Sequence, residues 1–200
     1  MPKLFYQGHG SYRIFSDNGI VIYVDPYAGV GYDIPADIIL VTHQHSDHNQ
    51  IRIVPKKKDC TVIQNVQSLK NGQYNSFFVK GIQIDSVPAY NKNHDPEECV
   101  GYVLTVDDVK IYAAGDTSAT EAMETILPDY QLDYALLPID GIYNMNAKEA
   151  EVCAKKIGAK VNIPIHVKPG VLFDRKMANK FHMKNRLIVE PNDEIELVRK

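Results

Sequence analysis

The chain has 200 residues, of which 44% are hydrophobic and 24% charged, a balance typical of a folded globular protein rather than a disordered or fibrous one. Its net charge of -3 and pI of about 6.1 argue against a basic surface that binds nucleic acid. Three cysteines without CxxC spacing argue against a disulfide framework, and no apolar run approaches the roughly 18 residues of a membrane span. We therefore expect one domain over residues 1–200, a cytoplasmic location and no membrane span.

Short runs rich in Val, Ile and Tyr predict the strands of the first half of the chain. They are Tyr12–Phe15, Ile20–Val24, Ile38–Thr42, Thr61–Gln64 and Ile82–Val87. The basic run Lys56–Lys58 follows Pro55 and is expected to be a solvated turn rather than a phosphate-binding patch. Short helices are further candidates near Asp47 and over Val66–Leu69.

The second half continues with strands and adds clearer helices. The predicted strands are Val100–Val106, Lys110–Ala114, Tyr134–Pro138, Val161–Ile165, Leu187–Val189 and Ile195–Val198, and the weaker predicted helices are Thr117–Leu127 and Asp174–Phe181. The strongest helix is Ala147–Ile157, which Asn146 can cap and Gly158 can end. Two strand-rich halves with helices outside them indicate a layered α/β sandwich.

The apolar run Ile38–Thr42 leads directly into a dense group of polar side chains, His43, His45, Asp47 and His48. Packing does not explain this group, because imidazoles and carboxylates are costly to bury unpaired. Residues two apart in extended backbone point the same way, so His43 and His45 can converge on one ion. If a helix follows, Asp47 and His48 project from its first turn toward a second ion. These ligand types suit zinc, and also manganese or iron.

This segment resembles the HxHxDH signature of the metallo-β-lactamase superfamily. The resemblance covers nearly the whole chain, through Gly8-His9-Gly10-Ser11, Val24-Asp25-Pro26, Gly115-Asp116-Thr117 and Pro164-Ile165-His166. The chain looks most like the small single-domain metal-dependent hydrolases, which are similar to sugar-phosphate lactonase-like proteins. The fold this implies is a four-layer αββα sandwich, with two mixed sheets flanked by helices and the metals where strand ends meet.

The resemblance also implies a ligand set for two divalent ions. His43 and His45 match ligands of the first metal, and Asp47 and His48 match ligands of the second. Asp116 matches the bridging carboxylate, and His166 the last histidine of the second metal. Relatives often carry the third histidine of the first metal directly after an Ala-aromatic pair, but here Asn91 follows Ala89-Tyr90. We assign His94 instead, with Asn91 or a water molecule as the alternatives.

Other residues are candidates for supporting roles. Asp25 is well placed to accept a hydrogen bond from a ligating histidine, and His9 and Asp140 resemble positions near the metal cleft. Lys168, just beyond His166, can meet an anionic group of the substrate or remain solvated. The loop residues Tyr143, Asn144 and Met145 are expected to rim the cleft or to pack against the following helix.

The function implied is hydrolysis of an ester, lactone or phosphodiester in a small-molecule substrate, which can be anionic. Two divalent ions, with Zn²⁺ the first choice and Mn²⁺ or Fe²⁺ the alternatives, would supply a metal-bound hydroxide. Asp47, His48 and Asp116 are the expected catalytic residues, with Asp47 orienting the hydroxide and carrying its proton. The competing interpretations are a non-catalytic or regulatory metal-binding protein and a nuclease on the same fold. A homo-oligomer is left open.

Overall fold

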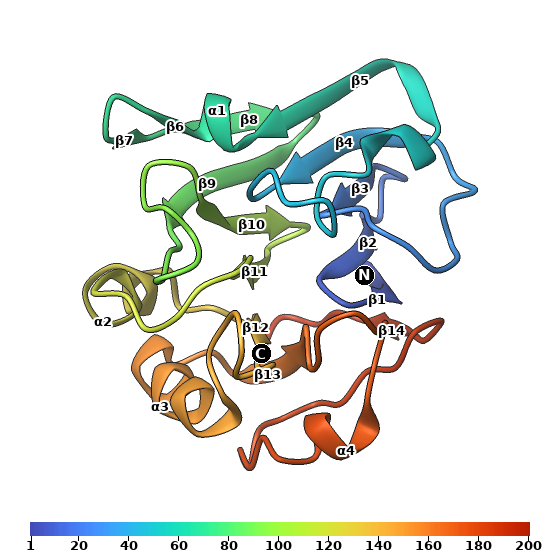
Figure 1. The fold of residues 1–200 in the computed structure, drawn as a ribbon. Helices are drawn as coiled ribbons and strands as arrows, with labels where there is room; N and C mark the ends of the chain where they lie inside the picture. The colour runs from blue at the N-terminus through green and yellow to red at the C-terminus, as the bar shows by residue number, and fades with distance from the viewer.

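Two six-stranded mixed sheets pack face to face in the computed structural model, which describes residues 1–200 (Figure 1). The first sheet has the order β14-β1-β2-β3-β4-β5. Its strands are β1 (Lys3–Gly8), β2 (Ser11–Phe15), β3 (Val21–Val24), β4 (Ala36–Val41), β5 (Lys56–Gln64) and β14 (Glu194–Glu196). The C-terminal strand β14 thus pairs with the N-terminal strand β1.

The second sheet has the order β13-β12-β11-β10-β9-β8. Its strands are β8 (Ser76–Val79), β9 (Ile82–Pro88), β10 (Val100–Val106), β11 (Val109–Ala113), β12 (Tyr134–Pro138) and β13 (Val161–Ile165). A small hairpin of β6 (Leu69–Lys70) and β7 (Gln73–Tyr74) lies between the two sheets in the sequence. Both main sheets are mixed, because β3, β4 and β5 run parallel in the first and β11, β12 and β13 in the second.

The main hydrophobic core lies between the two sheets. Alternate side chains along the strands point into it, among them Leu4 and Tyr6 from β1 and Tyr102 and Leu104 from β10, all of which are fully buried. Each such side chain stabilises the fold by roughly 1.5–3 kcal/mol relative to an exposed one. This core fixes the two sheets against each other and so fixes the edge where their loops meet.

Helices cover the outer face of the second sheet (Figure 1). They are α2 (Ala122–Thr125), η2 (Leu127–Tyr130) and α3 (Ala147–Ile157), while α1 (Asn65–Ser68) and α4 (Arg175–Ala178) lie elsewhere on the chain. Helix α3 begins and ends as predicted, since the Asn146 side chain accepts a hydrogen bond from the Glu149 N–H and Gly158 has a φ of +73°. The outer layer of the first sheet is thinner, with η1 (Ile51–Ile53) and the chain beside it packing on β3 and β4. The predicted αββα sandwich is confirmed.

Several predicted elements differ from the structure. Residues 187–189 form no strand, because the chain beside β13 makes only an isolated bridge between Asn162 and Arg186, and Pro164 in β13 has no N–H to extend the pairing. The predicted helix Thr117–Leu127 shrinks to α2 and η2, because the Thr117 hydroxyl and the Ser118 N–H bind the Tyr90 carbonyl oxygen. The chain near Asp47 is a turn, not a helix.

The basic run Lys56–Lys58 is not a turn but the start of β5, the outermost strand of the first sheet. Charged residues commonly protect such an edge from pairing with another chain. The Lys57 ammonium also lies 2.6 Å from the buried carboxylate of Asp37. No helix of the structure is long and apolar enough to cross a membrane.

Candidate metal centre

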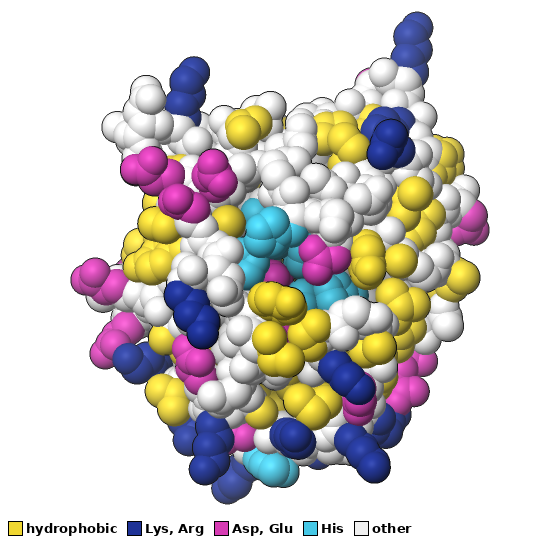
Figure 2. All heavy atoms as spheres, in the orientation of Figure 1, with side chains coloured by type: hydrophobic (Ala, Val, Ile, Leu, Met, Phe, Trp, Pro, Cys, Tyr) yellow, Lys and Arg dark blue, Asp and Glu magenta, His cyan; other side chains and the backbone are white.

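The predicted ligands come from the loops that follow strand ends, and the structure brings all of them to one edge of the sandwich. His43 and His45 follow β4, Asp116 follows β11 and His166 follows β13. Parallel strands of one sheet end at the same edge, so loops distant in the sequence meet there. Figure 2 shows histidine side chains gathered in a hollow at the centre of this face.

His43, His45 and His94 form what we call the first subsite. Each offers a ring nitrogen, and these nitrogen atoms lie within 4.8 Å of one another. The ring centroids of His94 lie 5.0 Å from His43 and 4.9 Å from His45. His94 reaches the group because its loop folds back, with the backbones of Asn91 and His94 exchanging two hydrogen bonds of 3.1 Å.

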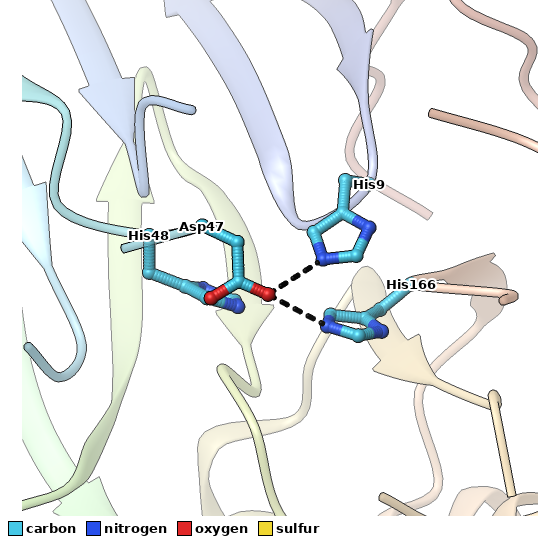
Figure 3. A group of neighbouring side chains, drawn as sticks. All are labelled: His9, Asp47, His48 and His166. Carbon is cyan, nitrogen blue, oxygen red and sulfur yellow. Dashed lines mark hydrogen bonds and ion pairs between the residues drawn. The ribbon is translucent and has the colours of Figure 1, made fainter. Parts of the chain in front are cut away.

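Asp47, His48 and His166 form the second subsite, which Figure 3 shows together with His9. A tight turn presents Asp47 and His48, closed by a 3.0 Å hydrogen bond from the His48 N–H to the His45 carbonyl oxygen. The rings of His48 and His166 lie nearly parallel, with centroids 5.6 Å apart.

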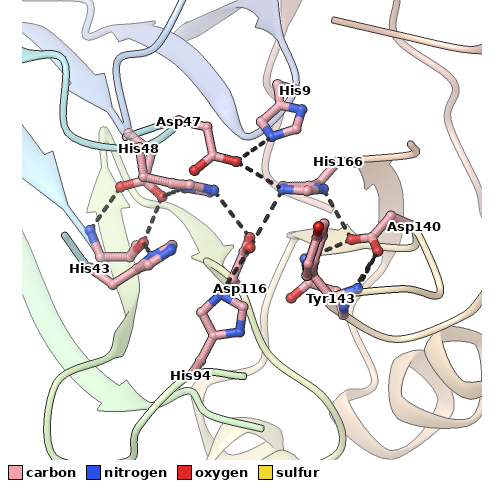
Figure 4. Close-up of polar contacts among 12 residues, drawn as sticks. His9, His43, Asp47, His48, His94, Asp116, Asp140, Tyr143 and His166 are labelled. Atoms are coloured by element: carbon pink, nitrogen blue, oxygen red, sulfur yellow. Dashed lines mark hydrogen bonds and ion pairs between the residues drawn. The ribbon is translucent and has the colours of Figure 1, made fainter. Parts of the chain in front are cut away.

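Asp116 lies between the two subsites (Figure 4). Its Oδ2 atom is 3.3 Å from His94 Nε2 and 3.4 Å from His166 Nε2, and its Oδ1 atom is 3.3 Å from His48 Nε2. The side chain is only 4% exposed. One carboxylate therefore faces histidines of both subsites.

His9 is a member of this group that the sequence placed only near the cleft. Its Nε2 atom lies 3.0 Å from Asp47 Oδ2, and its ring is 3.7 Å from that of His166 between centroids. The feature of the sequence that could have placed His9 at the second subsite is Gly10, which follows it. A Cβ atom at Gly10 would lie 2.8 Å from the His48 ring, so this turn can pack against the second subsite only with glycine at that position.

His48, His94 and His166 share one orientation, with Nδ1 facing away from the centre toward an oxygen atom. His48 Nδ1 lies 2.9 Å from Asp25 Oδ2, and His94 Nδ1 lies 2.9 Å from Asn91 Oδ1. His166 Nδ1 is 3.1 Å from Asp140 Oδ2. Carboxylate and amide oxygen atoms only accept hydrogen bonds, so Nδ1 of His48 and His94 carries the proton and Nε2 of each neutral ring points inward with a free lone pair.

Asp25 organises the end of β4. Its carboxylate accepts hydrogen bonds from the backbone and hydroxyl of Thr42 at 2.8 and 2.7 Å, as well as from His48. The Thr42 hydroxyl oxygen in turn lies 3.0 Å from His43 Nδ1. The expected contact between Asp25 and a histidine of the motif is therefore present, and it extends to a second histidine through Thr42.

The donor set fits metal ions by a test internal to the structure. The Nε2 atoms of His43, His48, His94 and His166 are buried and form no hydrogen bond. Buried nitrogen atoms without a partner are costly, and four of them aimed at one small volume are the arrangement that cations would satisfy. Histidines that bind metals usually hold the other ring N–H on a carboxylate or carbonyl oxygen, and His48 and His94 do so.

The electrostatics of the two subsites differ. Burial, with the neighbouring His48, lowers the pKa of His43 to about 2. Burial also acts to lower the pKa of His166, but the carboxylates of Asp116, Asp140 and Asp47 outweigh it and raise that pKa to about 10. Burial raises and the surrounding imidazoles lower the pKa of Asp116, which ends well below its usual range. Negative charge is therefore concentrated at Asp116 and around the second subsite.

Two cavities open from this centre. One of about 500 Å³ is lined by Asp47, Asp116, His166 and Tyr143, and one of about 730 Å³ extends from the first subsite toward the β6-β7 hairpin. Tyr143 is 51% exposed at the rim, but Met145 is buried in the core under the helices. Lys168 lines neither cavity, because its ammonium group faces Asp174 at 3.4 Å.

Residues 3–166 match the family described as a beta-lactamase superfamily domain. A UPF0173 metal-dependent hydrolase from Methanoculleus marisnigri is 32% identical over 182 residues, which cover 82% of this chain and 80% of that protein. Another protein of that name, from Thermococcus onnurineus, is 30% identical over 191 residues, which cover 83% of this chain and 84% of that one.

Solved structures of metal-dependent hydrolases have the same fold. A candidate metal-dependent hydrolase from Parabacteroides distasonis superimposes with a TM-score of 0.78 at 28% identity, covering 94% of this chain and 92% of that one. Igni18, a metallo hydrolase from Ignicoccus hospitalis, has a TM-score of 0.76 at 23% identity and 97% coverage of both chains, a likeness of fold. The chain belongs to the beta-lactamase superfamily and is a metal-dependent hydrolase with the metallo-β-lactamase fold.

Proposed function

We propose that this protein hydrolyses an ester, lactone or phosphodiester bond in a small molecule, using two divalent cations. The first subsite would hold one cation and the second subsite the other, with Asp116 shared between them. The observation that carries the proposal is the set of buried Nε2 atoms without hydrogen-bond partners around Asp116. Imidazole and carboxylate donors suit Zn²⁺ first and Mn²⁺ or Fe²⁺ as alternatives.

Cations held there would supply reactive water at neutral pH and polarise the oxygen of the bond to be cleaved. The protein's own residues do the remaining work. Asp116 would fix the two subsites relative to each other, because its two oxygen atoms face different histidines. His48, held by Asp25 and only 1% exposed, would keep the second subsite rigid.

Asp47 is the proposed proton carrier. Its side chain is 34% exposed and lines the 500 Å³ cavity, so it is accessible to a substrate. His9 Nε2 holds the Asp47 Oδ2 atom at 3.0 Å. The carboxylate can therefore accept a proton in the cavity and return it to the leaving group without losing its position.

The charged side chains that line the cavities indicate which substrates would bind there. The 500 Å³ cavity has no lysine or arginine in its lining. The larger cavity has one, Lys70, against the carboxylates of Asp95, Glu97 and Glu98. With Lys168 directed at Asp174, no cluster of cationic side chains is present to bind a phosphate group. Within the proposed set we therefore favour a neutral or amine-bearing ester or lactone over a phosphodiester or a phosphorylated sugar.

The test is reconstitution with defined metals. Protein stripped with a chelator and reloaded with Zn²⁺, Mn²⁺ or Fe²⁺ would be assayed on neutral esters and lactones, amine-bearing esters, phosphodiesters and sugar phosphates. We expect turnover that requires metal and is higher for neutral or amine-bearing compounds. Full activity in the stripped protein would contradict the proposal, and metal binding without turnover on any compound would support the regulatory alternative.

A further inference from the structure

Asn91 directly follows Ala89-Tyr90, and both ends of its side-chain amide form hydrogen bonds. Its Oδ1 atom accepts hydrogen bonds from His94 Nδ1 at 2.9 Å and from the Asn93 N–H at 2.8 Å. Its amide nitrogen donates to the Tyr143 carbonyl oxygen at 2.9 Å. Both ends of the amide are therefore occupied, so Asn91 is not free to bind a cation itself.

The contact with His94 decides which ring nitrogen faces the centre. Because Asn91 Oδ1 is an acceptor, His94 Nδ1 must carry the hydrogen and Nε2 must be the lone-pair nitrogen. That Nε2 atom is buried, forms no hydrogen bond and lies 3.3 Å from Asp116 Oδ2. His43 has Thr42 in the corresponding role, and His48 has Asp25.

The other end of Asn91 ties this histidine to the rim of the cleft. Tyr143, whose carbonyl receives the Asn91 amide, is held by its own N–H to Asp140 Oδ1 at 2.7 Å. The other oxygen of Asp140 faces His166 of the second subsite. A continuous set of contacts therefore runs from His94 through Asn91, Tyr143 and Asp140 to His166.

We propose that Asn91 is a positioning residue, which sets the tautomer and the ring orientation of His94 so that a cation can bind at the first subsite. This inference rests on the proposed function, because it takes His94 as a ligand. It replaces the alternative in which Asn91 is itself a ligand. Partners of this kind typically change metal affinity by about 10–100-fold when they are removed.

The experiment measures Zn²⁺ binding to the chelator-stripped full chain by calorimetry, with native mass spectrometry to count the bound ions. In Asn91→Ala we expect one of the two sites to weaken by about 10–100-fold and the other to stay within about 3-fold of the wild type. The unchanged site shows within the same molecule that the protein is folded. Asn91→Asp keeps the acceptor for His94 but loses the amide donor to Tyr143, so it should restore most of the affinity.

Asn93→Ala is the matched control, because Asn93 also donates to the Tyr143 carbonyl, at 3.1 Å, but does not contact the His94 ring. We expect near wild-type binding at both sites. Wild-type affinity in Asn91→Ala would overturn the inference, and so would equal losses in Asn91→Ala and Asn93→Ala, or failure of Asn91→Asp to restore binding. If the wild-type chain itself binds no Zn²⁺, the proposed function fails instead.

Discussion

The two subsites meet at Asp116 but are built differently. The first has three histidines, of which His45 is exposed to the larger cavity, and neutral groups support two of them, the Thr42 hydroxyl and the Asn91 amide. The second is more deeply buried and its histidines face the carboxylates of Asp25 and Asp140. Carboxylate support and negative charge favour a bound cation. The second subsite should therefore retain its ion firmly, and the first should exchange ions more readily.

The largest effect is expected from changing Asp116, the residue that both subsites share. Asp116→Asn keeps the size of the side chain and removes its charge, so both subsites should lose affinity and hydrolysis should fall by more than about 100-fold, beyond the usual effect of a group that only supports a ligand. Steady-state kinetics and metal analysis of the same preparation would measure this. Two firmly bound ions in Asp116→Asn would show that the subsites do not depend on this carboxylate.

The next largest effect separates the subsites. In Asp140→Asn, one of the two carboxylate oxygen atoms becomes an NH₂ group, which can only donate, and the charge that faces His166 Nδ1 is lost. The second subsite should therefore bind Zn²⁺ about 10–100-fold more weakly. The first subsite should change less, which reverses the pattern expected for Asn91→Ala. Calorimetric titration of the two variants side by side would show which site each substitution weakens. If both substitutions weakened the same site, the proposed difference between the subsites would be wrong.

The pH dependence sharpens the same comparison. In the metal-free protein, His166 has a pKa raised to about 10, so its interactions stabilise the fold below about pH 6.5 and are lost as the pH rises toward 10. His43, with its pKa lowered to about 2, stays neutral and instead disfavours folding as the pH falls below about 6.5. NMR of the histidine rings at pH 8 should find His166 protonated and His43 neutral. Titration of both rings near pH 6.5 would contradict this contrast.

The sequence predicted the sandwich and the strand ends better than it predicted the path of the loop that carries His94, for a physical reason. Continuous apolar runs such as the one in β4 lead directly to residues whose place follows from the strand end, as that of His43 does. His94 lies instead in a loop whose path depends on the Asn91–His94 bridge and on contacts with Tyr143. Such contacts join segments distant in sequence, and no local pattern encodes them.

The edges of the sheets were also hard to predict. Strand β1 was missed although Leu4 and Tyr6 alternate with Lys3 and Phe5, and it gains a second partner only from β14 at the far end of the chain. Strand β8 was missed because its sequence, Ser-Phe-Phe-Val, does not alternate polar and apolar residues, although Phe78 proves to be 74% exposed. His9 follows β1, so missing this strand also hid its approach to Asp47.

The smallest effect is expected at Lys168. Because its ammonium group faces Asp174 outside both cavities, Lys168→Ala should remove only an exposed ion pair of small energy and change kcat/KM by less than about 2-fold. Lys70→Ala is the matched comparison, since Lys70 lines the larger cavity. A large loss in Lys168→Ala confined to anionic substrates would restore the expectation that this lysine binds them.

The most direct test is anomalous X-ray diffraction from crystals of the protein loaded with Zn²⁺. We predict two anomalous peaks on either side of Asp116, one among the Nε2 atoms of His43 and His94 with His45, and one among Asp47, His48 and His166. Reducing the Zn²⁺ concentration should weaken the first peak before the second. No peak at this edge of the sandwich, or one ion only at saturating Zn²⁺, would contradict the two-cation centre.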